Sequence, residues 1–226
     1  MKFEILKNET MINEHGVKLY RIRSLKDIHL DGFVYVPKGT LGGYIESEKN
    51  LSQTDNSWVC FDAQVFGDGR VEDNAVVLSG QVFDHAVISG NAVMHSGRMY
   101  DYAKAYDNAC IEGKPSIFGH SVICENAEIS EEPYIYGNAV IKGRARVGGK
   151  AHVCQNACLS GKASVYNSAH VFGNSLIGEN ARIYGFAYIY GDCRIFGNTH
   201  IYDQAHICCG DFNGNSVING DCVVGR

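Results

Sequence analysis

Aliphatic side chains recur at every sixth position over most of the chain, and a small residue stands two positions before most of them. Between these phrases lie pairs of turn-forming residues, such as Gly137 and Asn138. Side chains of a strand alternate between its two faces, so the small and the aliphatic residue point to the same side. Glycine and asparagine tolerate the positive φ angles of a sharp corner. Each phrase therefore predicts one short strand followed by one corner.

The repeat is continuous from Ala105 to Ile207, and it extends upstream to Val59 and downstream to Val224 with occasional steps of five residues. A unit this short cannot bury its own apolar face, and a self-similar array at a fixed period is typical of a solenoid. Three strands in a triangular coil give about 18 residues per coil and roughly ten coils. We therefore predict an all-β, single-stranded parallel β-helix, whose handedness the period alone leaves open.

The phrase resembles the hexapeptide repeat of left-handed β-helix proteins over about residues 57 to 226. It differs at the position after the aliphatic residue, where this chain often carries Tyr or Phe instead of a small or acidic residue. The segments YRIRSLKD, GTLGGYIESEKNLSQ and SWVCFDAQVFGDG also resemble the YdcK-like family, hexapeptide-repeat proteins of bacteria and phages. The resemblance implies a left-handed coil, a homotrimer with parallel axes and a fold shared with acyltransferases.

Residues 1–57 lie outside the repeat as it is identified from the sequence. Val17 to Leu25 alternates as a strand does, the segment 31–39 (DGFVYVPKG) predicts a second strand, and the segment 39–53 predicts a glycine-rich connection. The first coil of a solenoid exposes unpaired backbone, which a cap would cover. We predict a small β cap over 1–57 and the β-helix over 58–226, with a separate binding module in 1–57 as the alternative.

Charge and cysteine content narrow the classes of partner and the compartment. The net charge of −5 gives no reason to expect a nucleic acid polymer or a membrane surface as a partner. The N-terminal segment has no apolar run long enough for a signal peptide or a membrane span. Nine cysteines form no Cys-x-x-Cys motif. We expect a cytoplasmic protein, in the host cytoplasm if a phage encodes it, with mostly buried free cysteines and no metal site.

Outward residues of a triangular coil sort into columns, and one predicted face is rich in aromatic side chains. Its first column is Phe66, Phe83, Tyr100, Phe118, Tyr136, Cys154, Phe172, Tyr190 and Cys208. The column beside it is Tyr134, His152, His170, Tyr188 and His206. Another face gathers Tyr166, Tyr184 and Tyr202 beside Arg146, Arg182 and His200. Stacked rings stabilise a sheet, but a long exposed aromatic stripe is also typical of an interface.

We predict that ligand or interface residues lie on the first of these faces. They are Tyr134, Tyr136, His152, His170, Phe172, Tyr188, Tyr190 and His206. Neighbouring imidazoles about 5 Å apart would favour the neutral state. Because residues of one column are collinear, they do not converge on a metal ion without a second subunit.

The predicted function is that of a non-catalytic, self-associating scaffold or binding protein that holds a small planar or anionic ligand between subunits, without a cofactor. One alternative is an acyltransferase that uses acetyl-CoA, with His152, His170 or His206 as the general base. The uninterrupted repeat argues against it, because acyltransferases of this fold usually interrupt the coil with a loop. A second alternative, suggested by the occurrence of the family in phages, is a protein that sequesters a signalling nucleotide.

Overall fold

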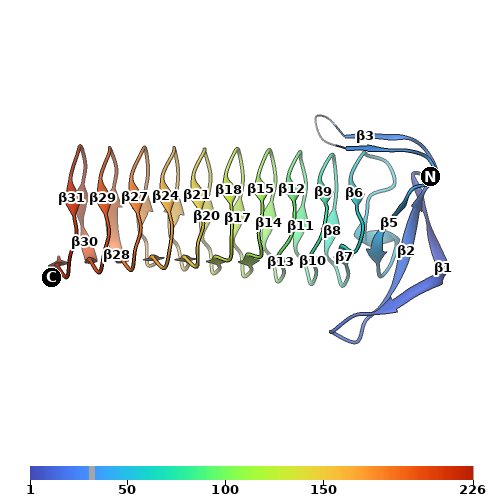
Figure 1. The fold of residues 1–226 in the computed structure, drawn as a ribbon, viewed down its shortest axis with the longest axis horizontal. Coiled ribbons are helices and arrows are strands. Elements are labelled where there is room, and N and C mark those ends of the chain that lie inside the picture. Colours follow the sequence, from blue (N-terminus) through green and yellow to red (C-terminus); the bar gives the residue numbers. More distant parts are fainter. Residues whose placement is uncertain (31–33, 226) are drawn as a thin grey trace.

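The computed structural model describes residues 1–30 and 34–225, and it shows a long prism of stacked coils with a β cap at its N-terminal end (Figure 1). Each coil contributes one short strand to each of three faces, and equivalent strands pair in parallel from one coil to the next. Side chains related by one coil are 18 residues apart in most of the stack. The predicted all-β parallel solenoid is confirmed, while its left-handed sense stays a prediction.

The three faces are named here by their order in the coil. Face 1 consists of β7 (Gln64–Val65), β10 (Gln81–Val82), β13 (Arg98–Met99), β16 (Ser116–Ile117), β19 (Tyr134–Ile135), β22 (His152–Val153), β25 (His170–Val171), β28 (Tyr188–Ile195), β30 (His206–Phe212) and β32 (Val223–Val224). Face 2 consists of β8 (Arg70–Val71), β11 (Val87–Ile88), β14 (Lys104–Ala105), β17 (Val122–Ile123), β20 (Val140–Ile141), β23 (Cys158–Leu159), β26 (Leu176–Ile177) and the C-terminal halves of β28 and β30.

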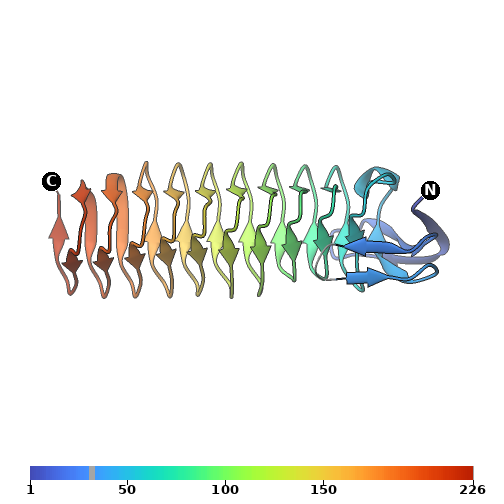
Figure 2. The same cartoon turned by 90° about the horizontal axis from the view of Figure 1, so that it is seen from above.

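Face 3 is a separate 10-stranded parallel sheet. Its strands are β6 (Trp58–Val59), β9 (Val76–Val77), β12 (Val93–Met94), β15 (Cys110–Ile111), β18 (Glu128–Ile129), β21 (Arg146–Val147), β24 (Ser164–Val165), β27 (Arg182–Ile183), β29 (His200–Ile201) and β31 (Val217–Ile218). Seen from above, successive coils lie in a nearly straight row (Figure 2). Outward side chains therefore form straight columns along the axis.

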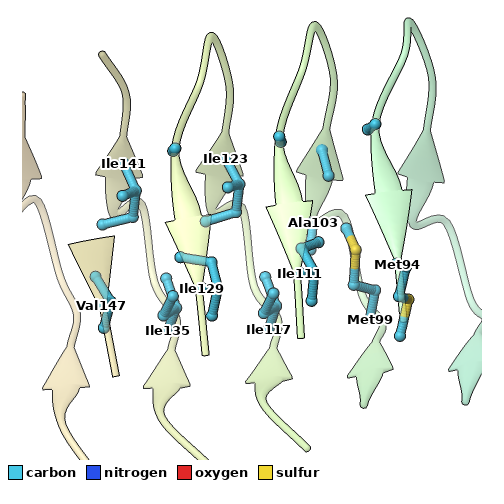
Figure 3. Close-up of a cluster of buried hydrophobic side chains, with 14 of the residues drawn as sticks. Met94, Met99, Ala103, Ile111, Ile117, Ile123, Ile129, Ile135, Ile141 and Val147 are labelled. Atoms are coloured by element: carbon cyan, nitrogen blue, oxygen red, sulfur yellow. The ribbon is translucent and has the colours of Figure 1, made fainter. Parts of the chain in front are cut away.

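The core runs along the prism axis and is built from the small and aliphatic residues of the repeat. Ile135, Ala139 and Ile141, for example, are all fully buried. Burying one isoleucine side chain stabilises the folded state by roughly 1.5–3 kcal/mol. Met94 and Met99 stand among the inward side chains near Ala103 in this core (Figure 3), and all three are fully buried. Flexible methionine side chains fill irregular gaps in a core.

Positive φ angles and stacked amides form the corners. Gly137 has φ of 71°, and a Cβ added there would lie 2.8 Å from the backbone nitrogen of Gln155 in the next coil. Asparagine side chains form rows in which each amide donates to the next amide oxygen. The row at the corner before face 3 contains Asn56, Asn74, Asn91, Asn108 and Asn126. The same corner carries a second row of Asn180, Asn198 and Asn215.

The N-terminal segment forms antiparallel hairpins that lead into the first coil. Its elements are β1 (Phe3–Ile12), β2 (Lys18–Ser24), β3 (Ile28–Leu30), β4 (Val34–Val36), β5 (Leu41–Ile45) and the 3₁₀ turn η1 (Glu48–Asn50). β1 pairs with β2, β2 with β5, and β3 with β4. The predicted strand at 31–39 coincides with β4 in part, and its residues 31–33 lie outside the described residues.

Parallel pairing begins before residue 58. Ile45 pairs with Val65, and Leu51 forms a bridge to Val71, so the segment expected as a connection supplies two strand positions of a coil. The tip of the β1–β2 hairpin also touches face 1, because Glu14 forms an ion pair of 2.7 Å with Arg98. No helix in the described part of the chain has the length and apolarity to cross a membrane.

Candidate functional site: an aromatic and imidazole face

Five outward rings of face 1 form one continuous stack along the axis. Parallel register places Tyr134, His152, His170, Tyr188 and His206 directly above one another, at the first position of β19, β22, β25, β28 and β30. Successive ring centroids are 4.9, 4.6, 4.5 and 5.1 Å apart, with interplanar angles of 19° or less. The spacing equals the separation of neighbouring strands, so the stack follows from the register of the coils.

The second aromatic column of face 1 stands beside this stack, two residues further along each strand. Its N-terminal rings are stacked with centroids 4.9 to 5.1 Å apart, in the order Phe66, Phe83, Tyr100, Phe118 and Tyr136. Cys154 interrupts the column, which resumes with Phe172 and Tyr190 at 5.6 Å. All eight predicted ligand or interface residues therefore lie together on one face.

Edge-to-face contacts join the two columns. Tyr136 meets His152 at 6.4 Å with an interplanar angle of 85°, and Phe172 meets Tyr188 at 6.3 Å and 89°. The positive edge of one ring then approaches the negative face of the other, an arrangement worth about 0.5–1.5 kcal/mol beyond area burial. These contacts hold the rings in fixed orientations, which makes the face rigid.

The two central imidazoles of the stack favour the neutral state. Burial lowers the pKa of His152, and burial together with the charge of His152 lowers the pKa of His170. A hydrogen bond with Cys154, together with burial, raises the pKa of Tyr136 to about 12. Among the described residues, histidine ion pairs involve only His15, His85 and His95. No carboxylate thus forms an ion pair with a stacked imidazole in that part of the chain.

Phe186 extends the face beyond the residues expected from the sequence. It stands at the corner just before β28, and its side chain is 63% exposed. Tyr134, at the N-terminal end of the stack, is 44% exposed. The equivalent corner positions of the two preceding coils carry the polar residues Lys150 and Ser168. An apolar residue at this position is unusual, and this signal in the sequence could have identified Phe186.

For acid–base chemistry, the three candidate histidines lie in one column with Tyr188 between His170 and His206. A general base must reach the proton that it removes and is commonly oriented by a third group. In the described structure no carboxylate orients these imidazoles through an ion pair. The arrangement therefore supports ring contacts with a partner better than proton transfer.

A different cluster on face 3 brings together metal-ligating atoms that the sequence analysis did not identify. His95 Nε2 and Cys110 Sγ lie 3.9 and 3.8 Å from Glu112 Oε1, and the three donor atoms all lie within 4.8 Å of one another. Nitrogen, sulfur and oxygen donors of this kind could hold Zn²⁺ with a fourth position open. Burial and the nearby Glu112 carboxylate raise the pKa of Cys110 to about 11, so binding would require loss of the thiol proton.

A scan against protein-family models finds none that matches the chain, and a search of curated proteins also finds no match.

Proposed function

We propose that the protein is a non-catalytic β-solenoid that self-associates through face 1 and holds a small planar or anionic ligand in the grooves between its copies. The observation that carries this proposal is the continuous stack of rings from Tyr134 to His206, which is only half-buried in the single chain. An exposed aromatic patch of this length favours a partner that covers it.

A second copy of the chain is the occupant that fits this face. The stack is straight and repeats at the strand spacing, so a parallel copy meets the same ring chemistry at every coil. Phe186 and Tyr134 are exposed and would be buried by a neighbour on this face. Aromatic residues of this kind are enriched at the energetic centre of interfaces.

The proposed groove between copies would suit a planar or anionic ligand. The rings already stack on one another, so they present their edges outward and leave no space for a ring to enter the stack. A ligand would therefore contact ring edges, imidazole nitrogens and tyrosine hydroxyls, which can donate hydrogen bonds to an anion. The preferred stoichiometry is a trimer, as in the YdcK-like family that the sequence resembles.

The cytoplasmic location belongs to the same proposal. The protein has nine free cysteines, three of which, Cys60, Cys124 and Cys154, are buried on outward positions close to the surface of the coil. Burial raises the pKa of Cys60 to about 11, which keeps the thiol protonated and unreactive. Free thiols in this number suit a reducing compartment.

The test is the mass of the protein in solution at micromolar concentration. We expect sedimentation velocity to give an oligomer for the wild type and a monomer for Tyr134→Ser/Phe186→Ser, because this variant removes two exposed rings of face 1. Tyr106→Ser is the matched control, since Tyr106 is 36% exposed but follows β14 on face 2. It should leave the oligomer unchanged.

A wild-type monomer at this concentration would contradict the proposal. Acyl transfer would be favoured instead by a thermal shift with acetyl-CoA that disappears when His152, His170 and His206 are all replaced by alanine.

A further inference from the structure

Face 3 carries an open groove with a cationic lining near the C-terminal half of the prism. Its volume is about 660 Å³. Its lining residues are Arg144, Arg146, Lys162, Ser164, Tyr166, Asn167, Asn180, Arg182, Tyr184 and His200. Four of these side chains are cations and none is a carboxylate, although the protein as a whole has a net charge of −5.

The groove arises from one small residue in a column of long ones. Ser164 pairs in register with Arg146 on one side and with Arg182 on the other. Its short side chain leaves a depression over β24, and the two guanidinium groups border it along the axis. Lys162, at the corner before β24, and Tyr166, directly after β24, also line it.

The row of hydrogen-bonded asparagines at the corner before face 3 is interrupted beside this groove. The corner before face 3 carries hydrogen-bonded asparagines from Asn56 to Asn126 and again from Asn180 to Asn215. Arg144 and Lys162 occupy the two intervening positions. An asparagine at either position would continue the row. Arg144 and Lys162 instead place two neighbouring cations there. A local departure from the pattern that costs stability and has no structural gain is expected at functional sites.

Most of this positive charge lacks an internal partner. Arg146 forms an ion pair with Glu128 at 2.8 Å. Within residues 1–30 and 34–225, no ion pair involves Arg144, Lys162 or Arg182. Guanidinium groups bind phosphate oxygens through two parallel hydrogen bonds, so neighbouring arginines suit a phosphate better than a single carboxylate.

An aromatic surface adjoins the cations. Tyr184 stacks on Tyr202 at 4.9 Å, whereas Tyr166 leans over Gly148, where an added Cβ would lie 2.7 Å from its Cε1 atom. Tyr166 can lean in this way because Gly148 has no side chain. The rings of Tyr166 and Tyr184 thus diverge, and both line the groove. Arg182 lines the same groove.

We propose that this groove binds a phosphorylated small molecule that carries an aromatic ring, with its phosphates held by Arg144, Arg146, Lys162 and Arg182 and its ring against Tyr184. This site is on a different face from the proposed subunit interface and does not depend on it. Arg146 exchanges part of its contact with Glu128 for the ligand.

The test is isothermal titration calorimetry at low salt with adenosine 5′-diphosphate, inorganic pyrophosphate and adenosine as probes. Arg144→Asn/Lys162→Asn is the decisive variant, because it completes the asparagine row and therefore leaves the coil folded. We expect the Kd for adenosine 5′-diphosphate to weaken by at least about tenfold in this variant. Pyrophosphate should bind more weakly than the diphosphate, and adenosine should bind most weakly of the three.

Lys114→Asn/Lys150→Asn is the matched control, since it removes the same charge at the same position of the repeat but at the corner before face 1. It should preserve the affinity. Equal losses in both double variants would overturn the proposal, because the binding would then follow net charge alone. No detectable binding of either phosphate at millimolar concentration would also overturn it. Equal affinities for pyrophosphate and adenosine 5′-diphosphate would overturn the contact with the ring.

Discussion

At the scale of single residues, the least expected feature is the fully buried side chain of Lys2 in the cap. Its Nζ donates to Asp55 Oδ1 at 3.0 Å, to the carbonyl of Ser57 at 2.7 Å and to Ser57 Oγ at 3.1 Å. Burial lowers the pKa of Lys2 to about 8, against the opposing effect of Asp55. Burial by itself would raise the pKa of Asp55, but hydrogen bonds from Ser57, Ser52 and Lys2 outweigh it and lower the value to about 2.

The directions of these two pKa shifts determine whether folding stability rises or falls with pH. The contribution of Asp55 to stability is complete above its ordinary pKa of 3.8 and is lost as the pH falls through about 2. Lys2 acts differently, because the folded state binds fewer protons than the unfolded state between about pH 8 and 10.5. Its desolvation cost is therefore relieved as the pH rises through that window, and stability rises with it.

Replacing Asp55 by Asn should destabilise the protein by about 3 kcal/mol, because it leaves the buried ammonium group of Lys2 without its counter-ion. Urea denaturation at pH 7 measures the change. Asp68→Asn is the control, since its ion pair with Lys49 is solvent-exposed and its loss should change stability little. A similar loss in both variants would contradict the role assigned to the buried pair.

At the scale of elements, the imidazoles of β22 and β25 make the folding stability of the protein depend on pH. Because the pKa values of His152 and His170 are lowered in the folded state, the unfolded chain binds more protons as the pH falls through the ordinary value of 6.5. Stability is therefore fully present above that value and decreases below it. Two protonated rings 4.6 Å apart would also repel each other.

We expect the melting temperature to fall between pH 7 and pH 5 by several degrees, and this fall to shrink in His152→Phe/His170→Phe, whose rings still stack between Tyr134 and Tyr188. Differential scanning calorimetry at the two pH values measures it. Tyr134→Phe, which keeps a ring at the end of the same stack and removes no imidazole, should retain the wild-type fall. An unchanged pH dependence in the double variant would show that other groups cause it.

The columns could be predicted from the sequence because the period is fixed. Residues that are one period apart in the sequence are therefore neighbours in successive coils. His152 and His170 are one coil apart in sequence and adjacent in space for that reason. The first coil was missed because Ile45 and Leu51 lack the preceding alanine and the glycine corners of later phrases. The sequence also placed Tyr166, Tyr184, Arg146 and Arg182 on one face, but the groove itself was not predicted, since it depends on the empty space above Ser164.

At the scale of the whole molecule, the prism behaves as a one-dimensional stack in which each coil contacts only its neighbours. Pro115 and Pro133 occupy equivalent positions, and their carbonyls accept from Arg98 and Ser116 of the preceding coil. Excision of residues 116–133 removes one complete coil and joins Pro115 to Tyr134, which restores the native dipeptide of Pro133 and Tyr134. Every column on all three faces then continues in register.

We expect the shortened protein to fold cooperatively, with a melting temperature within about ten degrees of the wild type, because only one coil's contacts are lost. Excision of residues 116–124 is the matched control. It removes only one and a half phrases, so residues such as Ile129 and Ile135 would fall at corners instead of pointing inward, and the chain beyond the junction would not continue the stack. Circular dichroism during thermal unfolding distinguishes the two variants. If both were equally folded, the register of the coils could not be what specifies this structure.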